Sequence, residues 1–215
     1  MRTAGSYQYP AMESVIYGKP AAKALCEEAE RLDARRVYLI VSRTLNTRTD
    51  EIEKIREGLG ERHAATFDGI PQHTTCEVVV QIAKQAKEAG ADLIVAIGGG
   101  SVVDAAKIVL MCLEHEIFEQ DGLDAYETTP ERRFGPFRNL RIRMIAIPST
   151  LSGGEYNSGA LVTDTRRKRH GSGAEAGRGC ARCTGARRRR GLWVLHRQAW
   201  PAAASRRCRH RRGPF

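Results

Sequence analysis

The sequence predicts an α/β fold built on a parallel sheet. Short, continuous apolar runs alternate along the chain with longer segments of helical periodicity, which is the order produced when crossover helices join parallel strands. The short runs are apolar at almost every position, a pattern typical of a sheet covered on both faces. With 41% hydrophobic residues among 215, the chain has enough apolar side chains to build such a core.

Helices are predicted where apolar residues recur every three or four positions. The third such segment also carries end signals, because Thr74 or Thr75 can cap its first turn and Gly90 can end it. In chain order, the predicted helices cover residues 21–32, 50–59, 76–89 and 102–113.

Strands are predicted where a short apolar run is bounded by polar or turn-forming residues. Pro148 closes the last strong run, and the polar stretch 119–139, which contains proline and glycine, is expected to be a loop. The strong strands are residues 36–41 (RVYLIV), 92–97 (DLIVAI) and 141–147 (RIRMIAI), and residues 63–67 and 159–163 are weaker extended segments.

Apolar patterning also bears on where the protein works. The chain has no run of roughly eighteen apolar residues, the length needed to cross a membrane. Its first residues lack the basic start and apolar stretch of a secretory signal. We therefore expect a cytoplasmic protein with no membrane partner, whose six cysteines are reduced.

The net charge of +10 is unevenly distributed along the chain. Residues 1–165 hold 19 basic and 24 acidic side chains, whereas residues 166–215 hold 16 basic and one acidic. The positive charge therefore belongs to the last fifty residues, and the part with α/β periodicity is mildly acidic. This distribution makes nucleic acid an unfavoured partner for the folded part.

Residues 166–215 differ from the rest of the chain in composition. They are rich in arginine, alanine and glycine and show no apolar pattern long enough for a secondary-structure element. Because GC-rich codons encode these residues, we hypothesise a frameshift near residues 167–171; a genuine disordered basic tail is the alternative. We predict an α/β domain over residues 1–165 and an Arg-rich tail over 166–215.

A glycine-rich turn follows the second strong strand and opens the next helix. It consists of Gly98, Gly99, Gly100 and Ser101. Without Cβ atoms the backbone can approach a pyrophosphate closely, and the first N–H groups of the helix can bind it. Ser101 can cap the helix or donate to a phosphate oxygen. A turn that only connects strand to helix is the alternative, since the motif is neither G-x-G-x-x-G nor a Walker loop.

Two spaced motifs carry a resemblance to a known family. The first is G-G-G-S-V-V-D-A-A-K at residues 98–107. The second is I-P-S-T-L-S-G-G-E at 147–155, followed by L-V-T-D at 161–164. Residues 1 to about 168 thereby resemble the iron-containing alcohol dehydrogenase and dehydroquinate-synthase-like superfamily, and the compact second motif is most similar to its maleylacetate-reductase-like branch.

The resemblance implies a two-domain oxidoreductase that uses NAD or NADP to transfer hydride to or from a small-molecule alcohol or carbonyl substrate. It implies a Rossmann-like domain whose glycine loop holds the cofactor's pyrophosphate, and it places Ser149, Thr150 and Ser152 on the nicotinamide side. Independently of the family, hydroxyls just past the carboxyl end of a strand lie where an open α/β sheet binds ligands. A merely polar turn is the alternative.

Cofactor choice is normally determined at the end of a neighbouring strand. An acidic residue there accepts from the adenosine ribose, and a basic residue accommodates a 2′-phosphate. This sequence has Ser42 and Arg43, where the resemblance implies an acidic residue in many members. The absence of that acidic residue weakens an expectation of NAD and makes NADP plausible, so both NAD and NADP stay open; a solvated loop arginine is the alternative interpretation of Arg43.

The family's iron or zinc is implied to bind an Asp and three His residues of an all-helical domain, none of which can be matched here. His170, His196 and His210 lack the helical context. Cys180 and Cys183 would need a second pair of ligands, and Cys208 with His210 lacks the usual spacing of a zinc site. We therefore predict an α/β domain truncated before the helical domain and inactive alone. A homo-oligomer is left open. The alternative is a nucleotide-binding protein whose basic tail binds nucleic acid non-specifically.

Overall fold

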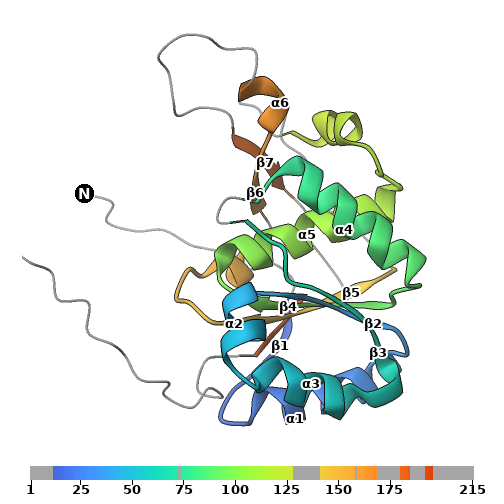
Figure 1. The fold of residues 1–215 in the computed structure, drawn as a ribbon, viewed down its shortest axis with the longest axis vertical. Helices are drawn as coiled ribbons and strands as arrows, with labels where there is room; N and C mark the ends of the chain where they lie inside the picture. The colour runs from blue at the N-terminus through green and yellow to red at the C-terminus, as the bar shows by residue number, and fades with distance from the viewer. Residues whose placement is uncertain are drawn as a thin grey trace, which may run out of the picture.

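A six-stranded sheet with helices on both faces organises the structure (Figure 1). The computed structural model describes residues 12–71, 74–127, 141–157, 159–168, 180–184 and 192–195. The strand order is β1-β8-β5-β4-β2-β3, and each described neighbour pair runs parallel. The strands are β1 (Met12–Ile16), β2 (Val37–Val41), β3 (His63–Phe67), β4 (Leu93–Gly98), β5 (Arg143–Pro148) and β8 (Leu192–Leu195).

The main helices divide between the two faces of this sheet. Two pack on one face, α1 (Ala21–Arg31) and α3 (Glu51–Leu59), and two on the other, α4 (Cys76–Glu88) and α5 (Gly100–His115). A second, antiparallel pair joins β6 (Gly159–Thr163) to β7 (Cys180–Thr184). The short elements are α2 (Arg43–Arg48), α6 (Thr165–Lys168) and the 3-10 turns η1 (Gly60–Arg62), η2 (Gln120–Tyr126) and η3 (Gly154–Tyr156).

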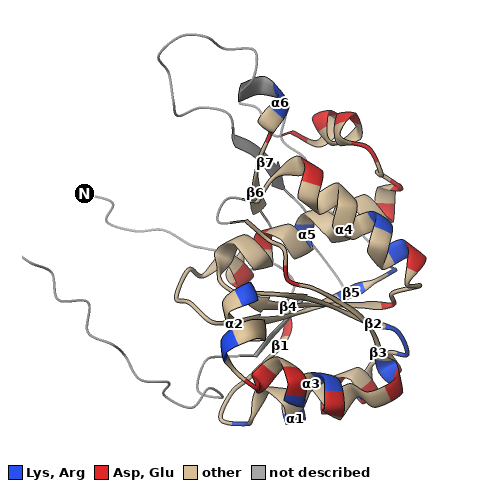
Figure 2. Cartoon of the chain, viewed as in Figure 1, with Lys and Arg blue, Asp and Glu red and all other residues tan. Residues whose placement is uncertain are grey.

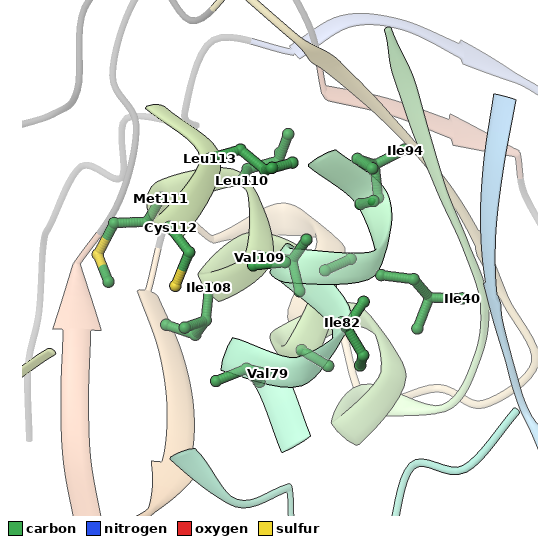
Figure 3. Packing of buried hydrophobic residues seen from close by; sticks show 14 of the residues in the cluster. Ile40, Val79, Ile82, Ile94, Ile108, Val109, Leu110, Met111, Cys112 and Leu113 are labelled. Carbon is green, nitrogen blue, oxygen red and sulfur yellow. The ribbon is translucent and has the colours of Figure 1, made fainter. Parts of the chain in front are cut away.

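Burial on both faces explains why the central strands are apolar at every position. Along β2 and β4, alternate side chains enter two separate cores. Ile40 and Ile94 pack with Val79, Ile82 and Val109 beneath α4 and α5 (Figure 3), whereas the residues between them face α1 and α3. A sheet covered twice leaves no polar face, and the strand pattern is therefore continuous rather than alternating.

The chain changes direction across the sheet between β2 and β4. These strands are neighbours, yet the chain leaves β2 toward α3 on one face and leaves β4 toward α5 on the other. The two connections therefore part at the carboxyl ends of the strands. Open α/β sheets bind their ligands in the crevice that such a parting leaves.

The predicted α/β fold with its parallel sheet is confirmed. The four predicted helices are confirmed too, and each of their boundaries agrees within two residues. Thr75 rather than Thr74 caps α4, because its Oγ1 accepts from the Val78 N–H at 3.4 Å. The sequence did not predict β1 or α2. The expected loop 119–139 was wrong over its first part, which contains η2, and residues 128–140 lie outside the described part.

The expectation that no element follows Asp164 was also wrong. Three short elements follow it: α6, β7 and β8. The four residues of β8, Leu-Trp-Val-Leu, lie between β1 and β5, where flanking strands supply both rows of hydrogen bonds. A run this short is a strand because of its neighbours rather than its own pattern. The predicted boundary near residue 165 and the frameshift remain predictions.

Tyr38 provides a test of the packing between β2 and α4. Its ring is buried, its hydroxyl donates to Gln85 Oε1 at 3.0 Å, and burial raises the pKa of Tyr38 to about 12 from 10.0. An unfolded chain releases this proton near pH 10, whereas the folded chain holds it until about pH 12. The free energy of unfolding should therefore fall as pH rises through this interval.

We predict that Tyr38→Phe lowers stability at neutral pH by about 1 kcal/mol, the worth of one hydrogen bond, and removes part of the alkaline loss. Urea unfolding at pH 8 to 11.5 measures both effects. Tyr17→Phe, at a side chain that is 71% exposed, is the matched control. Parallel stability curves for wild type and Tyr38→Phe would contradict the assignment.

Candidate functional site

Three loops meet at the carboxyl edge of the sheet, one after each of the adjacent strands β2, β4 and β5. The N–H of Ser42 donates to the Ile97 carbonyl and that of Ser149 to the Gly98 carbonyl, each at 2.8 Å. These bonds continue the sheet by one residue past β2 and β5. They fix both loops beside the glycine turn that ends β4.

Contact with the glycine turn is close enough that side chains would not fit. A Cβ atom at Gly98 would lie 2.8 Å from Val102 Cγ2 and 3.2 Å from Ser42 Cβ. At Gly99 it would lie 3.3 Å from Thr150 Cγ2. This distance is shorter than nine in ten of the contacts that real Cβ atoms make. The absence of side chains is therefore what lets the loop after β2 and the loop after β5 approach this turn.

The loop after β5 brings hydroxyl groups onto this turn. A Cβ atom at Gly100 would lie 3.2 Å from Ser152 Oγ, and one at Gly99 would lie 3.5 Å from Thr150 Oγ1. Both hydroxyl residues are exposed, and so is Leu151 between them, at 80%. The structure thus brings the predicted residues of both motifs together, with polar groups open to solvent at the carboxyl edge of the sheet.

Helix α5 begins directly at the glycine turn and extends for 16 residues. Its N-cap is Gly99, which offers no side chain to the first turn. The suggestion that Ser101 caps the helix was therefore wrong: the helix begins at Gly100, two residues before the predicted start, so Ser101 lies inside its first turn. The N–H groups of a first turn have no partner within the helix and, with its dipole, favour an anion.

A buried threonine that the sequence analysis did not single out for this role supports the first turn. Thr74 Oγ1 donates to the Ser101 carbonyl at 3.0 Å, and the Thr74 carbonyl accepts from the Thr163 N–H at 2.7 Å. Thr74 therefore links the start of α5 to β6. Its position directly before the cap of α4 gave no sign of this contact, which joins residues 27 apart in sequence.

Arg43 is the first residue of α2, directly after Ser42, and is exposed. Within the described ranges, no carboxylate forms an ion pair with it. Basic residues lie on α2 at the end of the sheet where α5 begins (Figure 2). The helix is held in place by Asn46, whose Nδ2 donates to Asp68 Oδ2 at 2.8 Å and whose Oδ1 accepts from Arg56 at 2.7 Å.

A largely buried ion pair follows one turn into α5. Lys107 Nζ lies 3.5 Å from Asp104 Oδ1, and the two side chains are 9% and 19% exposed. Burial raises the pKa of Asp104 and lowers the pKa of Lys107, while the attraction between them opposes both shifts. The pair lies beneath the segment that precedes β6.

The described residues contain no group of three or more His, Cys, Asp or Glu side chains placed to hold a metal ion. His170, His196 and His210 lie outside the described part, and so do the side chains of Cys180 and Cys183. No described helix is both long and apolar enough to span a bilayer.

An open parallel sheet with helices on both faces and a glycine turn at its direction change defines a Rossmann-like α/β domain. The chain belongs to the iron-containing alcohol dehydrogenase family, whose sequence model matches residues 12–176. It is 30% identical over 158 residues to Dehydrogenase FUM7 of Gibberella moniliformis, and 29% identical over 157 residues to Maleylacetate reductase 1 of Cupriavidus pinatubonensis. These alignments cover 71% and 73% of this chain.

Solved structures share the fold at lower identity. A sulfoacetaldehyde reductase from Bifidobacterium kashiwanohense, in complex with NAD+, has a TM-score of 0.68 at 16% identity over 88% of this chain. A maleylacetate reductase from Agrobacterium tumefaciens has a TM-score of 0.59 at 18% identity over 91%. The chain spans 45% and 43% of these structures, and 37% and 36% of the two curated relatives.

We predict that Gly98→Ala destabilises the fold by about 1 to 3 kcal/mol, because the new Cβ overlaps Val102 and crowds Ser42. Gly154→Ala is the matched control, since its Cβ would meet atoms only at 3.8 Å or beyond. Urea unfolding of both variants measures the difference. Equal stability of the two variants would show that the glycine turn is not packed as described.

Proposed function

We propose that this chain forms the cofactor-binding part of an NAD(P)-dependent oxidoreductase that interconverts an alcohol and a carbonyl compound. Membership of the iron-containing alcohol dehydrogenase family supports the reaction class. The structural relative solved with NAD+ supports the cofactor class. The observation that carries the proposal is the side-chain-free turn at the start of a 16-residue helix, with hydroxyl groups beside it at the direction change of the sheet.

Each part of this edge has a role in the proposed binding mode. The first turn of α5, with Gly98, Gly99, Gly100 and Ser101, holds the pyrophosphate through backbone N–H groups. The hydroxyls of Ser149, Thr150 and Ser152 donate to the phosphate, ribose or ring substituents on the nicotinamide side. When bound, the nicotinamide ring supplies the hydride acceptor or donor.

We further propose that these residues do not complete a reaction by themselves. Hydride transfer needs the substrate held against the nicotinamide ring, and the family's metal polarises the substrate oxygen. The described residues offer no set of ligands for that metal. The chain spans less than half of the relatives it matches, so the activity, substrate and any self-association belong to the longer proteins.

Cofactor choice is proposed to depend on Arg43. It lies after the strand adjacent to the glycine turn, and Ser42 directly before it touches the Gly98 position. A guanidinium there can form two hydrogen bonds to the 2′-phosphate of NADP, whereas it cannot accept a hydrogen bond from the ribose hydroxyl of NAD. Asp68, on the next strand's loop, already accepts from Asn46.

The basic segment is the source of the alternative function, non-specific binding to nucleic acid. Its arginine clusters at residues 187–190 and 206–212 lie outside the described part. No observation favours this function over the first.

We predict that Ser101→Glu weakens binding of both NADH and NADPH at least about tenfold, because its carboxylate repels the pyrophosphate. An acidic residue in the first turn of a helix is otherwise favourable, so the fold should be retained. Fluorescence titration of the full chain measures the dissociation constants. Ser101→Gln, of similar size without charge, is the control, and equal weakening by both variants would argue against a phosphate at this turn.

We predict that the wild type binds NADPH more tightly than NADH and that Arg43→Asp reverses the preference, with a combined change in the affinity ratio of about tenfold or more. Arg48→Asp, on the same exposed helix, is the control for a general change of charge. The same titrations give both ratios. An unchanged ratio in Arg43→Asp would make Arg43 an ordinary solvated side chain, with the binding site itself intact.

A further inference from the structure

Lys107 makes an unusual set of contacts for a helix lysine. Its Nζ donates to the carbonyl of Gly154 at 2.6 Å and to that of Gly159 at 2.8 Å, and it lies 3.4 Å from Asn157 Oδ1. With Asp104 at 3.5 Å, all three ammonium protons have acceptors in a nearly buried position. One side chain of α5 thus holds both ends of the segment between η3 and β6.

Asp104 extends this attachment to the next strand. Its Oδ2 accepts from the Leu161 N–H at 3.2 Å, while its other oxygen faces Lys107. The pair therefore fixes η3, residue 157 and the start of β6 against the same face of α5. Figure 1 shows these segments beside the first half of that helix.

The segment held in this way is continuous with the loop that carries the hydroxyl groups. That loop is fixed at its start by the bond between Ser149 and Gly98. Two residues after Ser152 it meets the Lys107 ammonium at Gly154. Within the described part of the chain, residues 150–152 make no hydrogen bond between these two attachments. Their distance from the glycine turn is therefore set from both ends.

The acidic groups around Lys107 mean that removing its positive charge alone destabilises the fold. Asp104 on the same helix and the buried Glu155 on η3 are the acidic groups that face it. Removing the ammonium alone leaves two poorly solvated carboxylates without their cation, which destabilises a fold strongly. Removing the charges of Asp104 and Lys107 together costs less, because only Glu155 then loses its cation.

We propose that Lys107 is a positioning residue for the cofactor site. It holds the hydroxyl loop, residues 149–153, against the glycine turn without touching the cofactor. This inference rests on the proposed cofactor site. It assigns to α5 two connected tasks, binding of the pyrophosphate at its first turn and attachment of the neighbouring loop two turns later.

The test compares cofactor affinity with stability in the full chain. Lys107→Met and the double variant Asp104→Asn/Lys107→Met should each raise the dissociation constant for NADPH or NADH about tenfold. The double variant should unfold at a higher urea concentration than Lys107→Met, because only one carboxylate then loses its cation and the amide oxygen introduced by Asp104→Asn can still accept from the Leu161 N–H. Lys107→Arg, which keeps the cation and its donors, should recover most of the affinity. Lys84→Met, which breaks the exposed pair with Glu119, is the control.

Amide hydrogen exchange of the unliganded variants locates the effect. Peptides covering residues 149–161 should exchange faster in the double variant, with β2 and α4 unchanged. Wild-type affinity in the double variant, or faster exchange spread equally over β2 and α4, would overturn the proposal. If Lys107→Met fails to fold, the double variant decides by the same two measurements. If the wild type binds neither cofactor, the proposed function itself fails, a result distinct from unchanged affinity in the variants.

Discussion

The contact between the glycine turn and its two neighbouring loops is the constraint on which the rest of the site depends. β4 lies between β2 and β5, so whatever follows it must pass between the loops that follow them. At Gly98 a single Cβ atom would overlap Val102 and crowd Ser42. Because no side chain intervenes, α5 can begin at Gly100, directly at the edge of the sheet, and its later turns can reach the segment before β6.

Under the proposed binding mode, the same helix has a binding end and a structural middle. Its first turn rests on Thr74, whereas its second and third turns pack in the core beneath α4 and carry the pair that holds η3 and β6. A site built in this way has rigid support from a doubly covered sheet, while its hydroxyl residues stay exposed. Preorganised backbone with accessible polar groups is the usual arrangement of a ligand site on an α/β scaffold.

The sequence predicted those parts of the fold that local pattern determines. Strands buried on both faces and helices with an apolar stripe have strong signals, and the glycine and hydroxyl motifs were placed correctly because each follows such a strand. α2 has no buried residue and β1 is partly exposed, so neither has a periodicity to detect. The support from Thr74 and the double attachment by Lys107 depend on residues 27 to 52 positions away, which no local pattern contains.

The solvent exposure of the hydroxyl loop gives a physical reason why the proposed cofactor binding and the hydride transfer would need different parts of such a protein. Thr150, Leu151 and Ser152 are open to solvent, and Leu151 presents an apolar side chain that is 80% exposed. A hydride acceptor beside them would face water on one side, yet transfer requires that a substrate occupy that side and that water be excluded. Under the proposed binding mode, the described residues form one wall of such a site. The relatives are more than twice as long as the segment that they share with this chain, and we propose that the opposite wall, with groups that orient and polarise a substrate, lies in that additional length.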